Sequence, residues 1–269
     1  MKIDAIAIFD IDGVIRDVGG SYRRALADTV EQFTAGAYRP SSIEIDRLKA
    51  EGLWNNDWEA SQELIYRYFE GIGTARESLG VSYEAIVAFF QSRYRGADLD
   101  NPDNWTGYIS QEPLLVSPAY FQQLTEGGIG WGFFRGATRG SATYVLCKRL
   151  GLSNPLLVAM EDAPGKPDPT GLLAALAQLE QQYSDAIETA IDLPVLYAGD
   201  TVADLYTVQK VAALRGDRRW IGVGILPPHV CETPERQQRY TALLQEAGAA
   251  VVLENIEQLN ARQIQALIS

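Results

Sequence analysis

The stretch that decides the fold lies near the N-terminus and reads Ile3-Asp4-Ala5-Ile6-Ala7-Ile8-Phe9-Asp10-Ile11-Asp12-Gly13-Val14. Its mainly apolar part, residues 3–9, is typical of a strand. Two aspartates at positions i and i+2 leave the end of that strand, and Gly13 permits a sharp turn. The stretch therefore predicts a strand whose carboxyl end presents two carboxylates to a crevice, although a solvated turn would show the same pattern.

Short apolar runs alternate with helical segments from Gln111 onward. The further runs expected to be strands are residues 129–134, 156–160, 195–198, 220–226 and 249–253. Between two of these runs, residues 138–150 carry apolar side chains at 3-4-3 spacing, with Gly151 as a C-terminal stop. Such alternation builds a parallel sheet with helices on both faces. We therefore predict a Rossmann-like α/β fold.

The segment from residue 18 to residue 104 differs, because it has helical periods and no convincing strand. Ser41-Ser42-Ile43-Glu44 fits a helix capping box, and an apolar stripe runs from Tyr22 to Phe33. We therefore expect an α/β core domain formed by residues 1–17 and 105–269, with residues 18–104 as an inserted all-helical cap domain. An insertion directly after the first strand would lie at the carboxyl ends of the sheet, where open α/β folds bind ligands.

Composition and charge exclude several classes of partner. The 269 residues include 23 Lys and Arg against 35 Asp and Glu, a formal net charge of −12. Such a field repels nucleic acid and anionic lipid, so we expect neither as a partner. The two cysteines, Cys147 and Cys231, are too few for a disulfide framework or a zinc site. With no secretory signal and no apolar window of ~20 residues, we expect a cytoplasmic protein; its oligomeric state is open.

Two further polar clusters follow predicted strands. The first reads Gly199-Asp200-Thr201-Val202-Ala203-Asp204 and comes after the run 195–198; the second reads Gly165-Lys166-Pro167-Asp168-Pro169 and comes after the run 156–160. A turn with an N-cap aspartate and a proline-stiffened loop with an exposed lysine are the structural alternatives. Because the carboxyl ends of parallel strands meet at one edge, we expect both clusters to lie near Asp10.

In this order the motifs resemble those of the haloacid dehalogenase superfamily of phosphotransferases. Three stretches carry the resemblance: Asp10-x-Asp12-Gly13-Val14, then Lys166-Pro167-Asp168-Pro169, then Gly199-Asp200-x-x-x-Asp204. The helical insertion resembles, by position and helicity, the cap of the subfamily that includes phosphoglycolate phosphatase and β-phosphoglucomutase. The resemblance extends over the whole chain.

The resemblance implies a role for each acidic residue and for the lysine. Asp10 would be the nucleophile that forms an aspartyl-phosphate, Asp12 the general acid and base, and Lys166 the cation that steadies both the nucleophile and the phosphoryl group. Mg²⁺ would be held by Asp10, Asp200, the backbone carbonyl of Asp12, and Asp204 directly or through water. The implied enzyme is a magnesium-dependent phosphatase of a small phosphorylated metabolite. A carboxylate at position 12 argues against dehalogenation.

The second motif of the superfamily departs from its pattern here. The superfamily has Ser or Thr at the end of the second core strand, whereas this chain continues its run 129–134 with Arg135-Gly136-Ala137-Thr138. The guanidinium of Arg135, with Gly136, would bind phosphate oxygens, or it would fill the pocket and pair with Asp10, or it would simply lie exposed in a loop. The alternatives to an active phosphatase are therefore a catalytically degenerate phosphate-binding or regulatory module, and a phosphomutase that uses the same residues.

Overall fold

The computed structural model describes the chain except residues 1, 50, 52, 55, 135–137 and 188–192. The chain divides into two compact units. The core unit consists of Met1–Asp17 and Pro113–Ser269, and the helical unit is Val18–Glu112. The second boundary therefore lies later than the expected position between residues 104 and 105.

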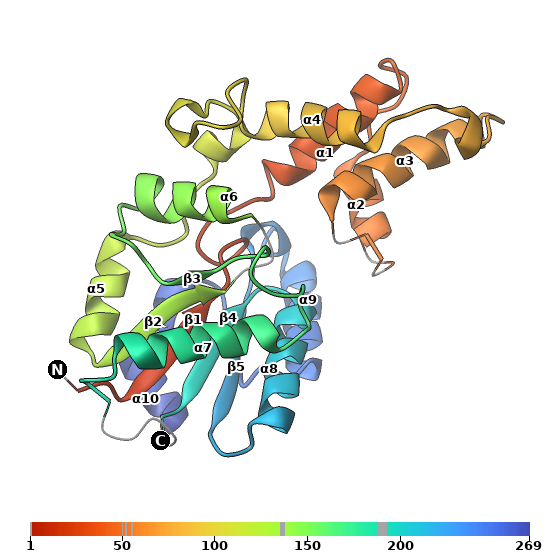
Figure 1. Ribbon diagram of the computed structural model, residues 1–269. Helices are drawn as coiled ribbons and strands as arrows, with labels where there is room; N and C mark the ends of the chain where they lie inside the picture. The colour runs from red at the N-terminus through yellow and green to blue at the C-terminus, as the bar shows by residue number, and fades with distance from the viewer. Residues whose placement is uncertain (1, 50, 52, 55, 135–137, 188–192) are drawn as a thin grey trace. The chain divides into compact units, whose positions relative to one another are not determined.

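The core unit contains one six-stranded sheet (Figure 1). Its strands are β1 (Ala5–Phe9), β2 (Ile129–Phe134), β3 (Leu157–Val158), β4 (Val195–Gly199), β5 (Trp220–Ile225) and β6 (Val251–Leu253). The spatial order is β3-β2-β1-β4-β5-β6, and every neighbouring pair is parallel. The predicted strands are thus confirmed: β2 has the predicted bounds, β4 is one residue longer, and the other four are shorter. The edge strand β3 is the most reduced, because only two of its residues pair with β2.

One face of the sheet packs against α7 (Thr170–Gln182) and α8 (Val202–Leu214). Successive side chains of a strand point to opposite faces, so Ile6 and Ile8 of β1 lie together on this face. They belong to an apolar cluster that includes Leu176 of α7 and Val208 of α8. A helix therefore follows both β3 and β4 on the same side of the sheet.

The opposite face packs against α5 (Pro118–Glu126) through aromatic rings. Phe9 of β1 lies on this face, with its ring centroid 5.9 Å from that of Phe121. Phe121 in turn lies 4.8 Å from Trp131 of β2. Edge-to-face and tilted pairs of this kind add to the stability gained from burial alone. The sheet is therefore covered on both faces, as predicted for a Rossmann-like α/β fold.

Three more α-helices belong to the part of the core unit that the structure describes. They are α6 (Arg139–Thr143), which continues as a π-helical segment Tyr144–Arg149, then α9 (Pro234–Glu246) and α10 (Ala261–Ile268). The helix predicted over residues 138–150 is confirmed, but it contains an i to i+5 hydrogen bond from Leu150 N to Val145 O (2.9 Å). Gly151 follows with a φ of +75°, the left-handed conformation that ends many helices.

The described residues of the helical unit form four helices of eight or more residues. They are α1 (Tyr22–Phe33), α2 (Ser42–Lys49), α3 (Asp57–Gly71) and α4 (Tyr83–Tyr94). The predicted capping box begins α2, since Ser41 N donates to Glu44 Oε2 (2.8 Å) and Glu44 N donates to Ser41 Oγ (3.3 Å).

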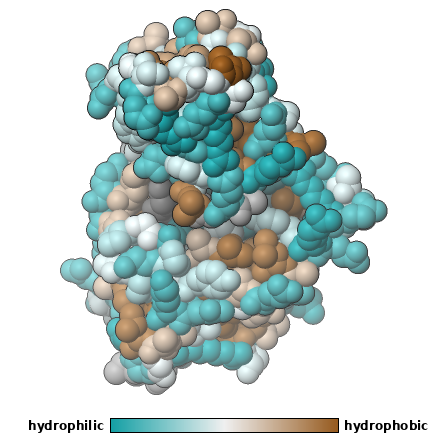
Figure 2. All heavy atoms as spheres, turned by 90° about the vertical axis from the view of Figure 1, so that its right-hand side faces the viewer, coloured by the Kyte–Doolittle hydropathy of each residue, from teal (hydrophilic) through white to brown (hydrophobic). Residues whose placement is uncertain are grey.

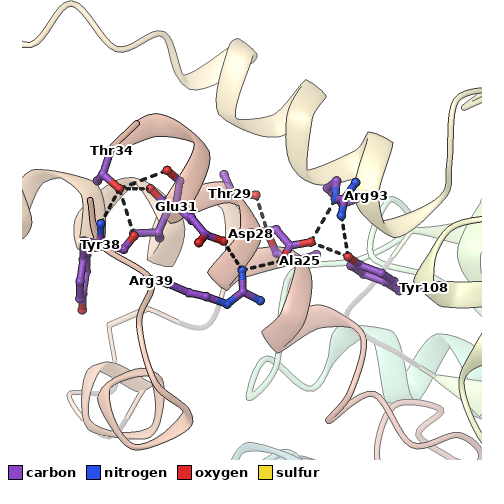
Figure 3. A network of polar contacts seen from close by, with 10 residues as sticks. Ala25, Asp28, Thr29, Glu31, Thr34, Tyr38, Arg39, Arg93 and Tyr108 are labelled. Carbon is purple, nitrogen blue, oxygen red and sulfur yellow. Dashed lines mark hydrogen bonds and ion pairs between the residues drawn. The ribbon is translucent and has the colours of Figure 1, made fainter. Parts of the chain in front are cut away.

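A polar network on Asp28 explains the later boundary of the helical unit (Figure 3). The carboxylate of Asp28, in α1, accepts from Arg39 (2.8 Å), from Arg93 of α4 (3.0 Å) and from the hydroxyl of Tyr108. The hydroxyl of Ser21 likewise donates to Glu112. These bonds join the segment that includes Tyr108 and Glu112 to α1, and so to the helical unit.

The face of the molecule drawn in Figure 2 is largely hydrophilic, with apolar patches separated by polar side chains. Such scattered apolar exposure is normal for a folded protein. Among the described residues, no helix combines the length and the apolar character needed to cross a membrane.

Candidate active site

Three carboxylates meet at the carboxyl end of the central strands. Asp10 follows β1 and Asp200 follows β4, and these strands are neighbours, with Phe9 in register with Ala198. Asp204 lies in the first turn of α8, which starts just after β4. One carboxylate oxygen from each of the three residues lies within 4.8 Å of the others. The structure therefore brings together acidic residues from opposite ends of the chain, as the two motifs predicted.

The turn after β1 depends on Gly13 for two independent reasons. Its φ is +75°, a conformation that side chains rarely adopt. A Cβ atom at this position would also lie 2.1 Å from Oδ2 of Asp200, far inside van der Waals contact. The absence of a side chain at Gly13 thus allows the Asp200 carboxylate to pack directly against the backbone of the Asp10–Asp12 turn.

Lys166 reaches this cluster from the loop between β3 and α7. Its Nζ lies 2.8 Å from Oδ1 of Asp10 and 2.6 Å from Oδ1 of Asp204. The side chain is 10% exposed, so the alternative of a solvent-exposed lysine is wrong. The ammonium also lies 5.3 Å from the ring centroid of Phe134 and 5.4 Å from that of Tyr197, within the range of cation–π attraction.

Asp204 receives hydrogen bonds on both of its oxygens. Oδ2 accepts from the backbone N (3.0 Å) and the hydroxyl (2.6 Å) of Thr201, and Oδ1 accepts from Lys166 and from the hydroxyl of Tyr197 (3.0 Å). Thr201 is the N-cap of α8 and forms a capping box with Asp204. The residue that caps this helix is therefore Thr201, and Asp200 is left free to point elsewhere.

Asp200 stands out from the other acidic residues of the cluster. Within the residues that the structure describes, no hydrogen bond or ion pair reaches its side chain, and Lys166 acts on it only through space. Its backbone carbonyl accepts a hydrogen bond from Tyr240 of α9 (2.9 Å), which fixes the residue at the end of β4. Burial, followed by the charges of Asp204 and Asp10, raises the pKa of Asp200 well above its usual value.

Among the other members of the cluster, the pKa values of Asp10 and Lys166 are raised and that of Asp204 is lowered. Burial, with the charges of Asp204 and Asp12, raises the pKa of Asp10 to about 6, although Lys166 opposes this rise. For Asp204, burial acts upward, but Lys166 and Thr201 hold its pKa below the usual value. Burial also acts against the charged form of Lys166, yet Asp10 and Asp204 keep its pKa above the usual value. Two of the three carboxylates, Asp10 and Asp200, are thus held in surroundings that disfavour their ionised forms when no further cation is present.

Comparison with known families agrees with this arrangement. The family model for haloacid dehalogenase-like hydrolases matches residues 5–210, which include Asp10, Lys166, Asp200 and Asp204. The chain belongs to this family. It is therefore a hydrolase by family, and the resemblance stated from its motifs is confirmed.

Three similar proteins illustrate the range of this likeness. A protein from Phytophthora nicotianae called imidazoleglycerol-phosphate dehydratase is 28% identical over 252 residues, which is 91% of this chain and 49% of that protein. The chain thus spans about half the length of this relative. A phosphatase from Thermococcus thioreducens has a TM-score of 0.62 at 22% identity, over 81% of this chain and 92% of that one. A phosphonoacetaldehyde hydrolase-like protein from Oleispira antarctica has a TM-score of 0.64 at 17% identity, over 100% of this chain and 93% of that one. At these identities both solved structures show a similar fold only.

The turn of this haloacid dehalogenase-like hydrolase also contains a residue that its motifs did not reveal. Nε and Nη2 of Arg16 each lie 2.7 Å from Oδ1 of Asp12, and the Arg16 side chain is 0% exposed. Asp12 itself remains 27% exposed. The only sequence signal was a basic residue four positions after an acidic one, a spacing that is common on protein surfaces.

The phosphate-binding residues expected at the second motif, Arg135 and Gly136, lie outside the described residues. Thr138, the nearest hydroxyl in sequence, is the N-cap of α6, and its hydroxyl donates to Ser141 Oγ (3.2 Å). The described part of the site therefore consists of the acidic cluster, Lys166, and the Asp12–Arg16 pair.

Proposed function

We propose that this hydrolase is a magnesium-dependent phosphatase that acts on a small phosphate monoester through an aspartyl-phosphate. The observation that carries the proposal is the Asp200 carboxylate, which lies beside Asp10 and Asp204 and has no hydrogen bond or ion pair within the described residues. Lys166 contacts Asp10 and Asp204, whereas no cation of the described chain contacts the Asp200 carboxylate. A site that needs an additional cation and already holds an ammonium is suited to a ligand with several anionic oxygens.

The residues present fit Mg²⁺. Magnesium prefers oxygen ligands and retains several waters, so few protein ligands suffice. The side chains of Asp10 and Asp200, with the backbone carbonyl of Asp12, would hold it. Asp204 would support the site through water, because four donors already occupy its two oxygens. When bound, the ion would neutralise charge on the oxygens of the transferring phosphoryl group.

In the first half-reaction a carboxylate oxygen of Asp10 attacks phosphorus, and the bond from phosphorus to the ester oxygen breaks. Asp12 donates a proton to that oxygen, so the product leaves as an alcohol. In the second half-reaction Asp12 takes a proton from water while the water oxygen attacks the phosphorus of the aspartyl-phosphate. The bond from phosphorus to the Asp10 oxygen breaks, which releases inorganic phosphate and restores the ionised Asp10 and the protonated Asp12.

Lys166 supports this chemistry through its direct contact with Asp10. An ammonium 2.8 Å from Oδ1 fixes the orientation of the nucleophile and favours its ionised form. It also offers positive charge to a phosphoryl group bound beside Asp10. We propose that the helical unit is a cap that excludes water from the reaction and selects the substrate.

The substrate class is open to a direct test. We would incubate the protein with an aryl phosphate and a panel of phosphate monoesters, with Mg²⁺ or EDTA, and measure inorganic phosphate. Because a relative carries the name imidazoleglycerol-phosphate dehydratase, the panel should include imidazole-bearing alkyl phosphates. We expect release only with Mg²⁺, and loss of activity in Asp10→Asn. Asp217→Asn is the matched control, because Asp217 is an exposed carboxylate paired with Arg215, and this variant should retain activity.

Product analysis of a sugar phosphate and a binding measurement separate the alternatives. Transfer of phosphate between sugar positions without net release would indicate a phosphomutase. Phosphate or trifluoroberyllate binding without turnover of any panel member would indicate a degenerate binding module and would contradict the proposed activity.

A further inference from the structure

Tyr197 contributes a buried polar group that the reaction described above does not use. It lies inside β4 and is 0% exposed. A phenylalanine would fill the same space in the apolar cluster between the sheet and α7. A buried hydroxyl needs a hydrogen-bond partner, so its presence in a core strand requires an explanation.

The hydroxyl of Tyr197 lies between two acceptors. It is 3.0 Å from Oδ1 of Asp204 and 3.1 Å from the backbone carbonyl of Phe134, the last residue of β2. One O–H carries one proton, so the two acceptors share a single donor. The charged carboxylate is the stronger acceptor, and it therefore receives the greater share of this bond.

Oδ1 of Asp204 is the same oxygen that contacts the ammonium of Lys166 at 2.6 Å. The ring centroid of Tyr197 also lies 5.4 Å from that ammonium, while the hydroxyl of Tyr197 donates to Asp204. Tyr197 thus acts on Lys166 both directly, through its ring, and indirectly, through Asp204.

We infer that Tyr197 is a positioning residue for Lys166. The hydroxyl of Tyr197 fixes Oδ1 of Asp204, and this oxygen in turn holds the ammonium of Lys166 against Asp10. Four side chains from different segments then form one chain of three contacts: Tyr197 to Asp204, Asp204 to Lys166, and Lys166 to Asp10. Thr201 fixes the other oxygen of Asp204, so the carboxylate has no freedom to rotate. The inference rests on the proposed phosphatase activity for its kinetic consequences, but not for its geometry.

Tyr197→Phe removes only the hydroxyl and leaves the ring. We expect kcat to fall about three- to tenfold, the effect of one hydrogen bond, while KM and the Mg²⁺ concentration for half activity remain unchanged. Tyr120→Phe is the matched control. Tyr120 is also buried, and its hydroxyl donates to the backbone carbonyl of Leu259 (2.9 Å), so each variant loses one buried hydroxyl but only Tyr197→Phe should lower kcat.

A double-mutant cycle tests whether Tyr197 acts through Asp204. In an Asp204→Asn background the shared carboxylate is absent, so Tyr197→Phe should change kcat by less than about twofold. An equal fall in kcat in both backgrounds would overturn the inference, because it would mean that Tyr197 acts independently of Asp204.

The closing experiment does not depend on turnover. The ammonium of Lys166 is shielded, so it should give a proton–nitrogen NMR signal that is lost in Lys166→Met. This signal should move or broaden in Tyr197→Phe and stay in place in Tyr120→Phe. An unchanged Lys166 signal in Tyr197→Phe would overturn the positioning role. Absence of phosphatase activity in the unmodified protein would instead contradict the proposed function, and the NMR result would still decide the role of Tyr197.

Discussion

The guanidinium of Arg16 directs two nitrogens, each at 2.7 Å, to one oxygen of Asp12. The arginine is completely buried, and a buried guanidinium is costly unless it is paired with an anion. The two residues are four apart in the turn that leaves β1, where Gly13 N donates to the carbonyl of Arg16 (2.9 Å). The ion pair therefore ties the orientation of the proposed general acid and base to the conformation of the turn.

Replacing Arg16 by methionine tests this orientation. Methionine fills much of the same volume without charge, so Asp12 loses a partner that holds its carboxylate. We expect kcat to fall roughly tenfold or more, as is typical when an acid–base group is misplaced, with a smaller change in KM. Arg16→Lys keeps one charged donor and should recover part of the loss. Wild-type kcat in a folded Arg16→Met protein would show that the pair has no role in turnover.

Gly13→Ala should disrupt both the turn and the acidic cluster. The new Cβ would have to displace Oδ2 of Asp200, and the backbone would remain in the left-handed region. We expect a loss of about 1–3 kcal/mol in the free energy of unfolding and no stabilisation by Mg²⁺. Gly20→Ala is the control, because a Cβ at Gly20 meets nothing within 4 Å. Urea unfolding of both variants, with and without Mg²⁺, measures these effects.

Stability of the metal-free protein should depend on pH through Asp10. Its pKa of about 6 lies above the unfolded value of 3.8, chiefly because of burial, so the ionised group destabilises the folded state. The cost is fully present above about pH 7 and disappears as pH falls through 6 toward 4. It amounts to at most roughly 3 kcal/mol. In EDTA, Asp10→Asn should therefore exceed the wild type in unfolding free energy at pH 8, and the difference should shrink by pH 5. A difference that is constant with pH contradicts this assignment.

The sequence was sufficient to predict most of the fold. Apolar runs marked the six strands, and the order of the acidic motifs predicted that Asp10 and Asp200 would meet, because both follow strands of one parallel sheet. The end of the helical unit could not be predicted in the same way. It depends on side-chain contacts such as Tyr108 to Asp28, which join residues distant in sequence.

The supporting residues of the site were harder to predict than its acidic residues. Tyr197 has the sequence context of an ordinary core-strand residue, and its role appears only when α8 places Asp204 against its hydroxyl. Arg16 likewise resembles a surface residue until the turn buries it. Motifs identify groups that do chemistry, whereas the groups that orient them are set by packing between segments.

Asp200→Asn tests whether the carboxylate at the end of β4 is a ligand of the proposed Mg²⁺ ion. In EDTA the substitution removes a carboxyl group whose pKa burial and the neighbouring Asp204 and Asp10 hold well above its usual value, and whose ionisation therefore costs stability. The variant should therefore melt at a higher temperature than the wild type at pH 8. With Mg²⁺ at about 100 times its Kd, the wild type should gain roughly 2.7 kcal/mol and the variant much less. Asp217→Asn should respond to Mg²⁺ like the wild type. Equal stabilisation of Asp200→Asn and the wild type by Mg²⁺ would exclude Asp200 as a ligand, and the metal site would have to be sought among the other carboxylates.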